Sequence, residues 1–432
     1  MALTLDSEPT LPFTSVGNPI EYLISSSNTA QPNFKFDVRV YYDPAGTNTL
    51  LAALKYDVLP NTTKALVDIS RIVQSQIVED ITNLRTSATG IKNETTRLKY
   101  VKVTFQEYYG TIPVTAGGVT SSSNLPIVNQ AYKKQQWVKS GEVAKYNIPA
   151  APGSDSLTGR LLTGFSNYVA ATDATINAAP STYFGGNYNV RKVNSDQLQQ
   201  IMFNWYGTGG TNKRVQFAYF TSAMALSFSY NRAITSATCP TSINIGTAAM
   251  IAIGSGAITG LDSTHKYFYA CIKNDTNQLT AAYLYEIDWS PCSRFTTYEI
   301  HWLNRFGGWD SWVFDKLSSH VSNIERKEYN QYTSPVSSSS IVHGSYELQG
   351  RNFVVNTKEQ YEVRSKYLRE WELQGLEHLI TSPQVYWNSP DGFIPITIQN
   401  PNTFEHKTNT VDKLFNLQFS FEVDNQDYRQ MP

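Results

Sequence analysis

The stretch Phe34-Lys35-Phe36-Asp37-Val38-Arg39-Val40-Tyr41-Tyr42 is the clearest structural signal in this chain. Apolar side chains at every second position alternate with charged or polar ones, and a β-strand places successive side chains on opposite faces. The stretch therefore predicts an antiparallel strand with one buried face and one solvated face. A turn follows at residues 43–46, where the sequence is Asp-Pro-Ala-Gly.

The same alternation recurs over residues 101–106 and predicts a second strand. Between the two strands, Ile69, Ile72, Val73 and Ile77 have helical spacing, with Asp68 or Ser70 as a candidate N-cap. Residues 1–112 are therefore expected to form an N-terminal β-sandwich of immunoglobulin-like size. Residues 113–130 are rich in Gly, Ser and Thr and are expected to be a linker or arm.

Residues 131–332 are expected to form a β-rich middle domain, with alternating runs near 224–230 and 283–287 and an aromatic hairpin near 298–314. A Ser-rich joint is expected at 333–345, followed by a C-terminal α+β domain over 346–432. In that domain Thr357 and Gln360 resemble a capping box. A helix is expected from Tyr367 to Thr381, followed by strands at 393–398 and 415–423. The fold class is mainly β, with several antiparallel β-sandwich-type domains.

Composition limits the possible partners. Charged residues make up 16% of the 432 residues, against about 25% in ordinary soluble proteins, and the formal net charge is −1. A direct nucleic-acid partner is not expected because no global basic field is present. The longest apolar stretch, residues 248–258, is too short for a membrane span, and the first residues do not resemble a secretory signal. We therefore expect synthesis in a cytoplasm.

Chemical motifs are weak. Cys239, Cys271 and Cys292 lie far apart, the six His residues have no metal-binding spacing, and neither a metal nor a cofactor is expected. The glycine-rich run at 254–260 resembles a dinucleotide loop but leads into a strand-like segment, which favours a hairpin turn. No catalytic residue is assigned. A glycosidase remains an alternative, with an acid and a nucleophile drawn from five carboxylates: Glu286, Asp288, Glu299, Asp310 and Asp315.

The densest cluster of aromatic residues lies in the predicted hairpin at 298–314, which holds three of the eight Trp residues. Adjacent Gly307 and Gly308 suit its turn. One interpretation is a buried core hairpin in which Arg305 pairs with Asp310 or Glu299. Two alternatives are an exposed anchor for a neighbouring subunit and a glycan platform. The candidate interaction residues are Trp302, Asn304, Arg305, Phe306, Gly307, Gly308, Trp309, Asp310 and Trp312.

The run from Trp302 to Asp310, WLNRFGGWD, resembles a W-x-N-R-[YF]-G-G-[WFY]-D segment of virion proteins from tailed phages that infect Bacteroidota, including crAss-like phages. Two further stretches are similar to such proteins. One consists of residues 17–20 leading to 33–36 and the later residues 67–70, and the other is 376–386. The resemblance covers most of the chain outside 131–290 and carries no active-site residue.

The resemblance implies a non-enzymatic structural protein of the virion that oligomerises as a ring or adaptor in the tail, baseplate or neck. Its expected partners are other copies of itself and other virion proteins, because low charge suits wide subunit contacts. The alternative is a receptor- or glycan-binding protein at the tail tip, whose partner would be a host surface glycan. That alternative requires Trp309 or Trp312 to be exposed.

Overall fold

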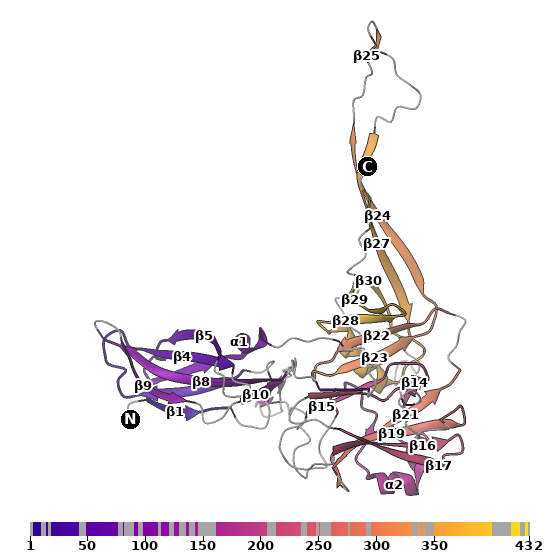
Figure 1. Ribbon diagram of the computed structural model, residues 1–432, viewed down its shortest axis with the longest axis horizontal. Coiled ribbons are helices and arrows are strands. Elements are labelled where there is room, and N and C mark those ends of the chain that lie inside the picture. The colour runs from indigo at the N-terminus through magenta and orange to yellow at the C-terminus, as the bar shows by residue number, and fades with distance from the viewer. Residues whose placement is uncertain are drawn as a thin grey trace. The chain divides into compact units, whose positions relative to one another are not determined.

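The computed structural model contains two compact units. Unit 1 comprises Met1–Ser290 and Leu303–Ser311, and unit 2 comprises Pro291–Trp302 and Trp312–Pro432. Antiparallel strands predominate and the helices are few and short (Figure 1), which confirms the predicted fold class. The structure describes residues 3–9, 14–15, 19–42, 49–76, 81, 90–93, 98–110, 114–120, 125–128, 135–137, 143–145, 161–204, 213–234, 240–247, 250, 261–274, 277–290, 295–330, 336–337, 340–341, 350–399, 416–423 and 428–430.

The N-terminal part of unit 1 contains two sheets around one apolar core. The first sheet consists of β1 (Leu3–Ser7), β3 (Glu21–Ser26) and β6 (Lys64–Asp68). The second consists of β2 (Thr14–Ser15), β4 (Lys35–Tyr42), β5 (Thr49–Tyr56), β8 (Leu98–Tyr109), β9 (Val114–Thr120) and β10 (Leu125–Val128). Phe36, Val38 and Val40 are fully buried, as the alternation in 34–42 predicts.

Two details of this part bear on the sequence expectations. The predicted helix is present but short, as α1 (Ser70–Gln74), and the Asp68 carboxylate accepts a hydrogen bond from the Ser70 amide at its start. Residues 113–130, expected to be a linker or arm, instead contain β9 and β10, both of which pair with β8. The Val and Thr residues of this segment suit strands, and pairing with β8 outweighs the flexibility of its glycines.

The remainder of unit 1 has a central sheet whose middle strands are buried on both faces. Its strands are β13 (Tyr168–Val169), β14 (Arg191–Asn194), β16 (Lys213–Thr221), β17 (Leu226–Ala233), β19 (His265–Asn274), β20 (Asn277–Gln278) and β21 (Ala282–Asp288). One face packs against α2 (Asp173–Ala178) and α3 (Pro180–Phe184) through Phe184 and Phe220.

A second sheet contributes to the core on the other face of the central sheet. It consists of β15 (Gln200–Asn204), β18 (Pro240–Asn244) and β7 (Ile91–Asn93). Phe203 and Ile243 of this sheet join the cluster that contains Phe217 and Phe268. β7 belongs to the first hundred residues of the chain, yet it pairs with β18, so the chain interleaves its segments within unit 1. Two short strands, β11 (Gln135–Trp137) and β12 (Val143–Lys145), pair separately.

Unit 2 holds most of an eight-stranded sheet and one helix. The strand order is β23 (Trp309–Phe314), β22 (Tyr298–Leu303), β28 (Val385–Ser389), β29 (Gly392–Ile398), β30 (Gln418–Val423), β27 (Gly350–Arg364) and β24 (Ser319–Asn330), with β31 (Tyr428–Gln430) beside β27. The helix α5 (Glu370–Ile380) lies within the expected helical range and buries Leu376 and Leu379. An aromatic cluster forms around Tyr361, whose ring centroid lies 5.3 Å from that of Phe421 and 5.5 Å from that of Trp387.

One local prediction in unit 2 is wrong. Thr357 and Gln360 belong to β27, where they pair with Ile324 and Val321 of β24, so they do not cap a helix. The helix that follows begins later, and the Glu372 carboxylate there accepts a hydrogen bond from the Arg369 amide at 2.8 Å. Within the Ser-rich joint, β25 (Val336–Ser337) pairs with β26 (Ser340–Ile341).

β24 and β27 form the longest strand pair of unit 2 (Figure 1). Their register runs from Ser319 opposite Glu362 to Asn330 opposite Gly350, with a bulge after Lys327. The other edge of β27 pairs with β30 through residues 360–364 and with β31 through residues 355–357. β24 is the terminal strand of the sheet.

Among the described residues, no helix is long and apolar enough to span a membrane.

Candidate functional site

The predicted hairpin is present, and its turn is tightly constrained. β22 and β23 are joined by Asn304–Gly308, where the Asn304 amide donates to the Gly308 carbonyl at 2.8 Å and the Gly307 amide donates to the Asn304 carbonyl at 3.0 Å. Gly307 has φ +80°, a left-handed conformation that favours glycine. At Gly308, a Cβ atom would lie 1.8 Å from the Leu162 carbonyl oxygen, so the close approach of two backbones requires glycine there.

Asn304 organises this turn from the inside. Its side chain is fully buried, and its Oδ1 accepts hydrogen bonds from the Phe306 amide at 2.9 Å and the Gly308 amide at 3.0 Å. Its Nδ2 donates to the Leu162 carbonyl and to the Asp310 carboxylate, both at 2.9 Å. An Asn side chain offers two donor hydrogens and an acceptor oxygen with two lone pairs. All of this capacity is used within the protein.

Asp310 connects the hairpin to a distant segment of unit 1. One carboxylate oxygen accepts a hydrogen bond from the Thr163 hydroxyl at 2.6 Å, and the other accepts one from the Gly164 amide at 2.8 Å as well as the bond from Asn304. Asp310 is 1% exposed. Its carboxylate therefore acts as a cross-link between segments about 150 residues apart, and it is shielded from solvent. We call Asn304, Asp310 and the backbone of 162–164 the hairpin lock.

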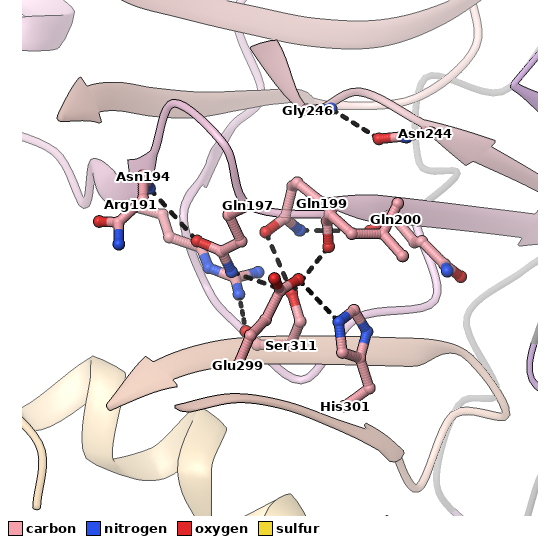
Figure 2. Close-up of polar contacts among 11 residues, drawn as sticks. Arg191, Asn194, Gln197, Gln199, Gln200, Asn244, Gly246, Glu299, His301 and Ser311 are labelled. Atoms are coloured by element: carbon pink, nitrogen blue, oxygen red, sulfur yellow. Dashed lines mark hydrogen bonds and ion pairs between the residues drawn. The ribbon is translucent and has the colours of Figure 1, made fainter. Parts of the chain in front are cut away.

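A second buried polar group surrounds Ser311, the next residue of β23. The Arg191 guanidinium donates to the Ser311 carbonyl, and Gln197 Nε2 donates to the Ser311 hydroxyl at 3.0 Å (Figure 2). The Ser311 hydroxyl in turn donates to the Leu198 carbonyl at 3.3 Å. Arg191 is 1% exposed, and its guanidinium lies 4.0 Å from the centroid of the Phe165 ring. These contacts hold β23 to the segment 191–199 within unit 1.

The aromatic residues of the hairpin are buried. Trp302 is fully buried, and Trp309 and Trp312 are each 2% exposed, while the Trp309 amide donates to the Met202 sulfur at 3.4 Å. Gly307 is also buried, whereas Arg305 and Phe306 are partly exposed. The exposure that a glycan platform on Trp309 or Trp312 requires is therefore absent at these two residues. Pairing of Arg305 with Asp310 or Glu299 stays a prediction.

The carboxylates considered for a glycosidase each contact a different partner. Glu286 lies 3.4 Å from Lys266, Asp288 lies 3.5 Å from Lys192, and Asp315 lies 4.0 Å from Lys316. In unit 2, Glu299 lies 2.8 Å from the Nε2 atom of buried His301 (Figure 2). Asp310 belongs to the hairpin lock, whose donors already occupy both oxygens. Each of the five carboxylates therefore has a polar partner within its own unit.

Metal and nucleophile candidates give little chemistry in the part of the chain that the structure describes. No group of three or more His, Cys, Asp or Glu side chains could hold a metal ion among these residues. Cys271 is a buried free thiol, and burial raises its pKa to about 12, so it is not poised as a nucleophile. Cys239, Cys292 and the glycine-rich run 254–260 lie outside the described residues.

Sequence reasoning found the hairpin but missed its partners. Thr163, Gly164, Arg191 and Gln197 lie more than 100 residues from the hairpin in sequence, and no motif marks them. The one usable signal was in the hairpin itself: the pattern Asn-x-x-Gly-Gly-x-Asp places polar residues at both ends of a glycine turn. Comparison with known proteins finds no matching family and no matching curated protein.

Proposed function

We propose that this chain is a non-enzymatic structural component of a phage virion, which oligomerises as a ring or adaptor in the tail, baseplate or neck. The observation that carries the proposal is the hairpin lock. Within the run that resembles virion proteins, Trp302 to Asp310, the fold buries Asn304 and Asp310 and hydrogen-bonds them to each other and to its own backbone. Such contacts suit a role in shape and not in turnover.

The polar groups of the lock favour a role in architecture. Buried polar networks with every member satisfied make a local structure rigid and specific. Asp310 receives hydrogen bonds from three donors of its own unit, so both of its oxygens are engaged within the fold. A rigid hairpin of this kind suits a protein whose surfaces must match those of neighbouring subunits in a symmetric assembly.

The receptor- or glycan-binding alternative has less support. A sugar platform needs an aromatic ring open to solvent, and Trp309 and Trp312 are each 2% exposed. The partners expected on this proposal are therefore other copies of the chain and other virion proteins.

Sedimentation velocity over a rising concentration series tests the proposal. We expect discrete assemblies larger than the 48.5 kDa monomer, and antibodies against the purified chain should label intact particles. A chain that stays monomeric at every concentration, and is missing from purified particles, would contradict the proposal.

The enzyme alternative has its own test. Asp310→Asn and Glu299→Gln variants should leave any background glycoside hydrolysis of the preparation unchanged. A hydrolytic activity that both substitutions abolish in a folded protein would overturn the structural assignment.

A further inference from the structure

β24 presents a long strand edge to solvent in unit 2. β27 is its partner on one side, and among the residues that the structure describes β24 ends the sheet on the other. Every residue from 319 to 329 is exposed, including three apolar or aromatic side chains: Val321 at 49%, Ile324 at 55% and Tyr329 at 42%. An exposed edge of this length is a template for pairing with another strand, because its outward amides and carbonyls are available.

Among the described residues, neighbouring strands support the β24–β27 pair from the β27 side. β30 pairs with residues 360–364 of β27, and β31 pairs with residues 355–357. The aromatic stack of His320 on Tyr361, with ring centroids 4.4 Å apart, anchors the base of the pair. Ile324, four residues farther along β24, lies on the same face of the sheet as His320 but is exposed. Opposite residues 324–326 of β24, β31 lies on the far side of β27, whereas no described strand lies on the outer side of β24, so a further strand could extend the sheet there.

Symmetry restricts how two copies of β24 can pair edge to edge. A two-fold axis perpendicular to the sheet reverses the strand direction and keeps each face on its own side. The axis must then pass beside one residue, which lies opposite its own copy. Centres at Glu325, Arg326 or Lys327 place like charges directly opposite one another, which is unfavourable.

A centre at Ile324 avoids these clashes. It places Ile324 opposite Ile324, Asn323 opposite Glu325, Ser322 opposite Arg326 and Val321 opposite the aliphatic stem of Lys327. Each of these pairs joins two apolar groups or a hydrogen-bond donor and an acceptor. A centre at Asn323 instead places Ile324 opposite Ser322 and Glu325 opposite Val321. All the paired residues lie before the bulge that follows Lys327, so their alternation between faces is regular.

We propose that β24 pairs antiparallel with β24 of a second copy of this chain, in the register centred on Ile324. The proposal deepens the proposed function and rests on it, since it names one contact through which the chain oligomerises. The pairing extends the sheets of two copies across the axis and covers the exposed Ile324 side chains.

Disulfide trapping tests the register. In an Ile324→Cys variant the two introduced thiols would be directly opposite, with Cβ atoms about 4.5–5.5 Å apart, close to the distance that a disulfide spans. Val321→Cys is the matched control, because Val321 is similarly exposed but lies three positions from the axis. Its two copies would be about 20 Å apart at ~3.4 Å per residue. Peptide mass spectrometry distinguishes a bridge at position 324 from bridges made by the native cysteines.

We expect a position-324 bridge in mild oxidant and none at position 321. An Ile324→Lys variant should weaken self-association about 10-fold, because it places two ammonium groups opposite each other, while Leu317→Lys outside β24 should not. Equal bridging at both positions, or no bridge at 324 together with unchanged association of Ile324→Lys, would overturn the proposal.

The same experiment separates this inference from the proposed function. If the wild-type chain forms large assemblies but fails both β24 tests, oligomerisation uses another surface and only the inference is lost. If the wild-type chain sediments as a monomer throughout, the oligomeric role itself is contradicted. Circular dichroism and thermal unfolding of each variant confirm that a loss of association is not a loss of folding.

Discussion

The hairpin lock in unit 1 and strand β24 in unit 2 contain similar polar side chains in opposite settings. Asn304 and Asp310 are at most 1% exposed, and their side chains make six hydrogen bonds of 2.6 to 3.0 Å when the bond that they share is counted once. Glu325, Arg326 and Lys327 are exposed along a strand edge.

The comparison separates two uses of polar residues in one chain. Where the fold supplies every hydrogen-bonding partner, removing one side chain leaves the others unpaired in an interior without water. The free energy of unfolding should then fall. Where solvent is the partner, substitution should cost little in folding and should act on association instead. Paired variants, one in the lock or its hairpin and one in β24, measure this difference.

The largest effect is expected for Trp309→Ala. Trp309 is 2% exposed, so its removal should leave a cavity and lower the free energy of unfolding by about 3–5 kcal/mol. Tyr329→Ala in β24 is the matched change and should shift stability by no more than about 0.5 kcal/mol. Urea unfolding followed by circular dichroism measures both. Equal losses would contradict the distinction between the two regions.

A smaller loss is expected for Asp310→Asn. The substituted amide would point donor hydrogens at the Thr163 hydroxyl, the Gly164 amide or Asn304 Nδ2, and at least one of these would lose its acceptor. We expect a loss of about 2–3 kcal/mol. Glu325→Gln in β24 makes the same kind of charge-to-amide change at an exposed site and should cost at most about 0.5 kcal/mol. A stable Asp310→Asn variant would show that the lock contributes little.

Gly307→Ala probes the turn alone. The left-handed φ of +80° should make alanine less stable than glycine by about 1–2 kcal/mol. Thermal unfolding gives the size of this loss. Ser322→Ala in β24 is the control and should leave the midpoint unchanged, so a matching shift in both variants would argue against strain at the turn.

The smallest folding effect is expected for Ile324→Lys. Ile324 is 55% exposed, so its replacement should change the free energy of unfolding by no more than about 0.5 kcal/mol at low protein concentration. A large loss of stability in the isolated monomer would mean that Ile324 is needed inside its own unit and is not an interface residue.

The sequence predicted the strands and the hairpin well because their signals are local. Alternation over 34–42, the glycine pair at 307–308 and the apolar spacing in 368–379 each specify an element without distant partners. The errors arose where pairing with segments distant in the sequence determines the local structure. Thr357 and Gln360 fit a helix cap in isolation, but pairing with β24 makes them part of a strand. The lock was not predictable because Thr163 meets Asp310 across 147 positions of sequence.

Hydrogen–deuterium exchange of both regions at low and high protein concentration tests the central claim most directly. The account predicts that the amides of Gly164, Phe306 and Gly308 are protected at every concentration, because they donate hydrogen bonds within the fold. In β24, the amides that point toward β27 should be protected at every concentration, whereas the outward-pointing amides around Ile324 should become protected only as the concentration rises. Rapid exchange in the lock, or outward-pointing amides of β24 whose exchange does not depend on concentration, would contradict this distinction.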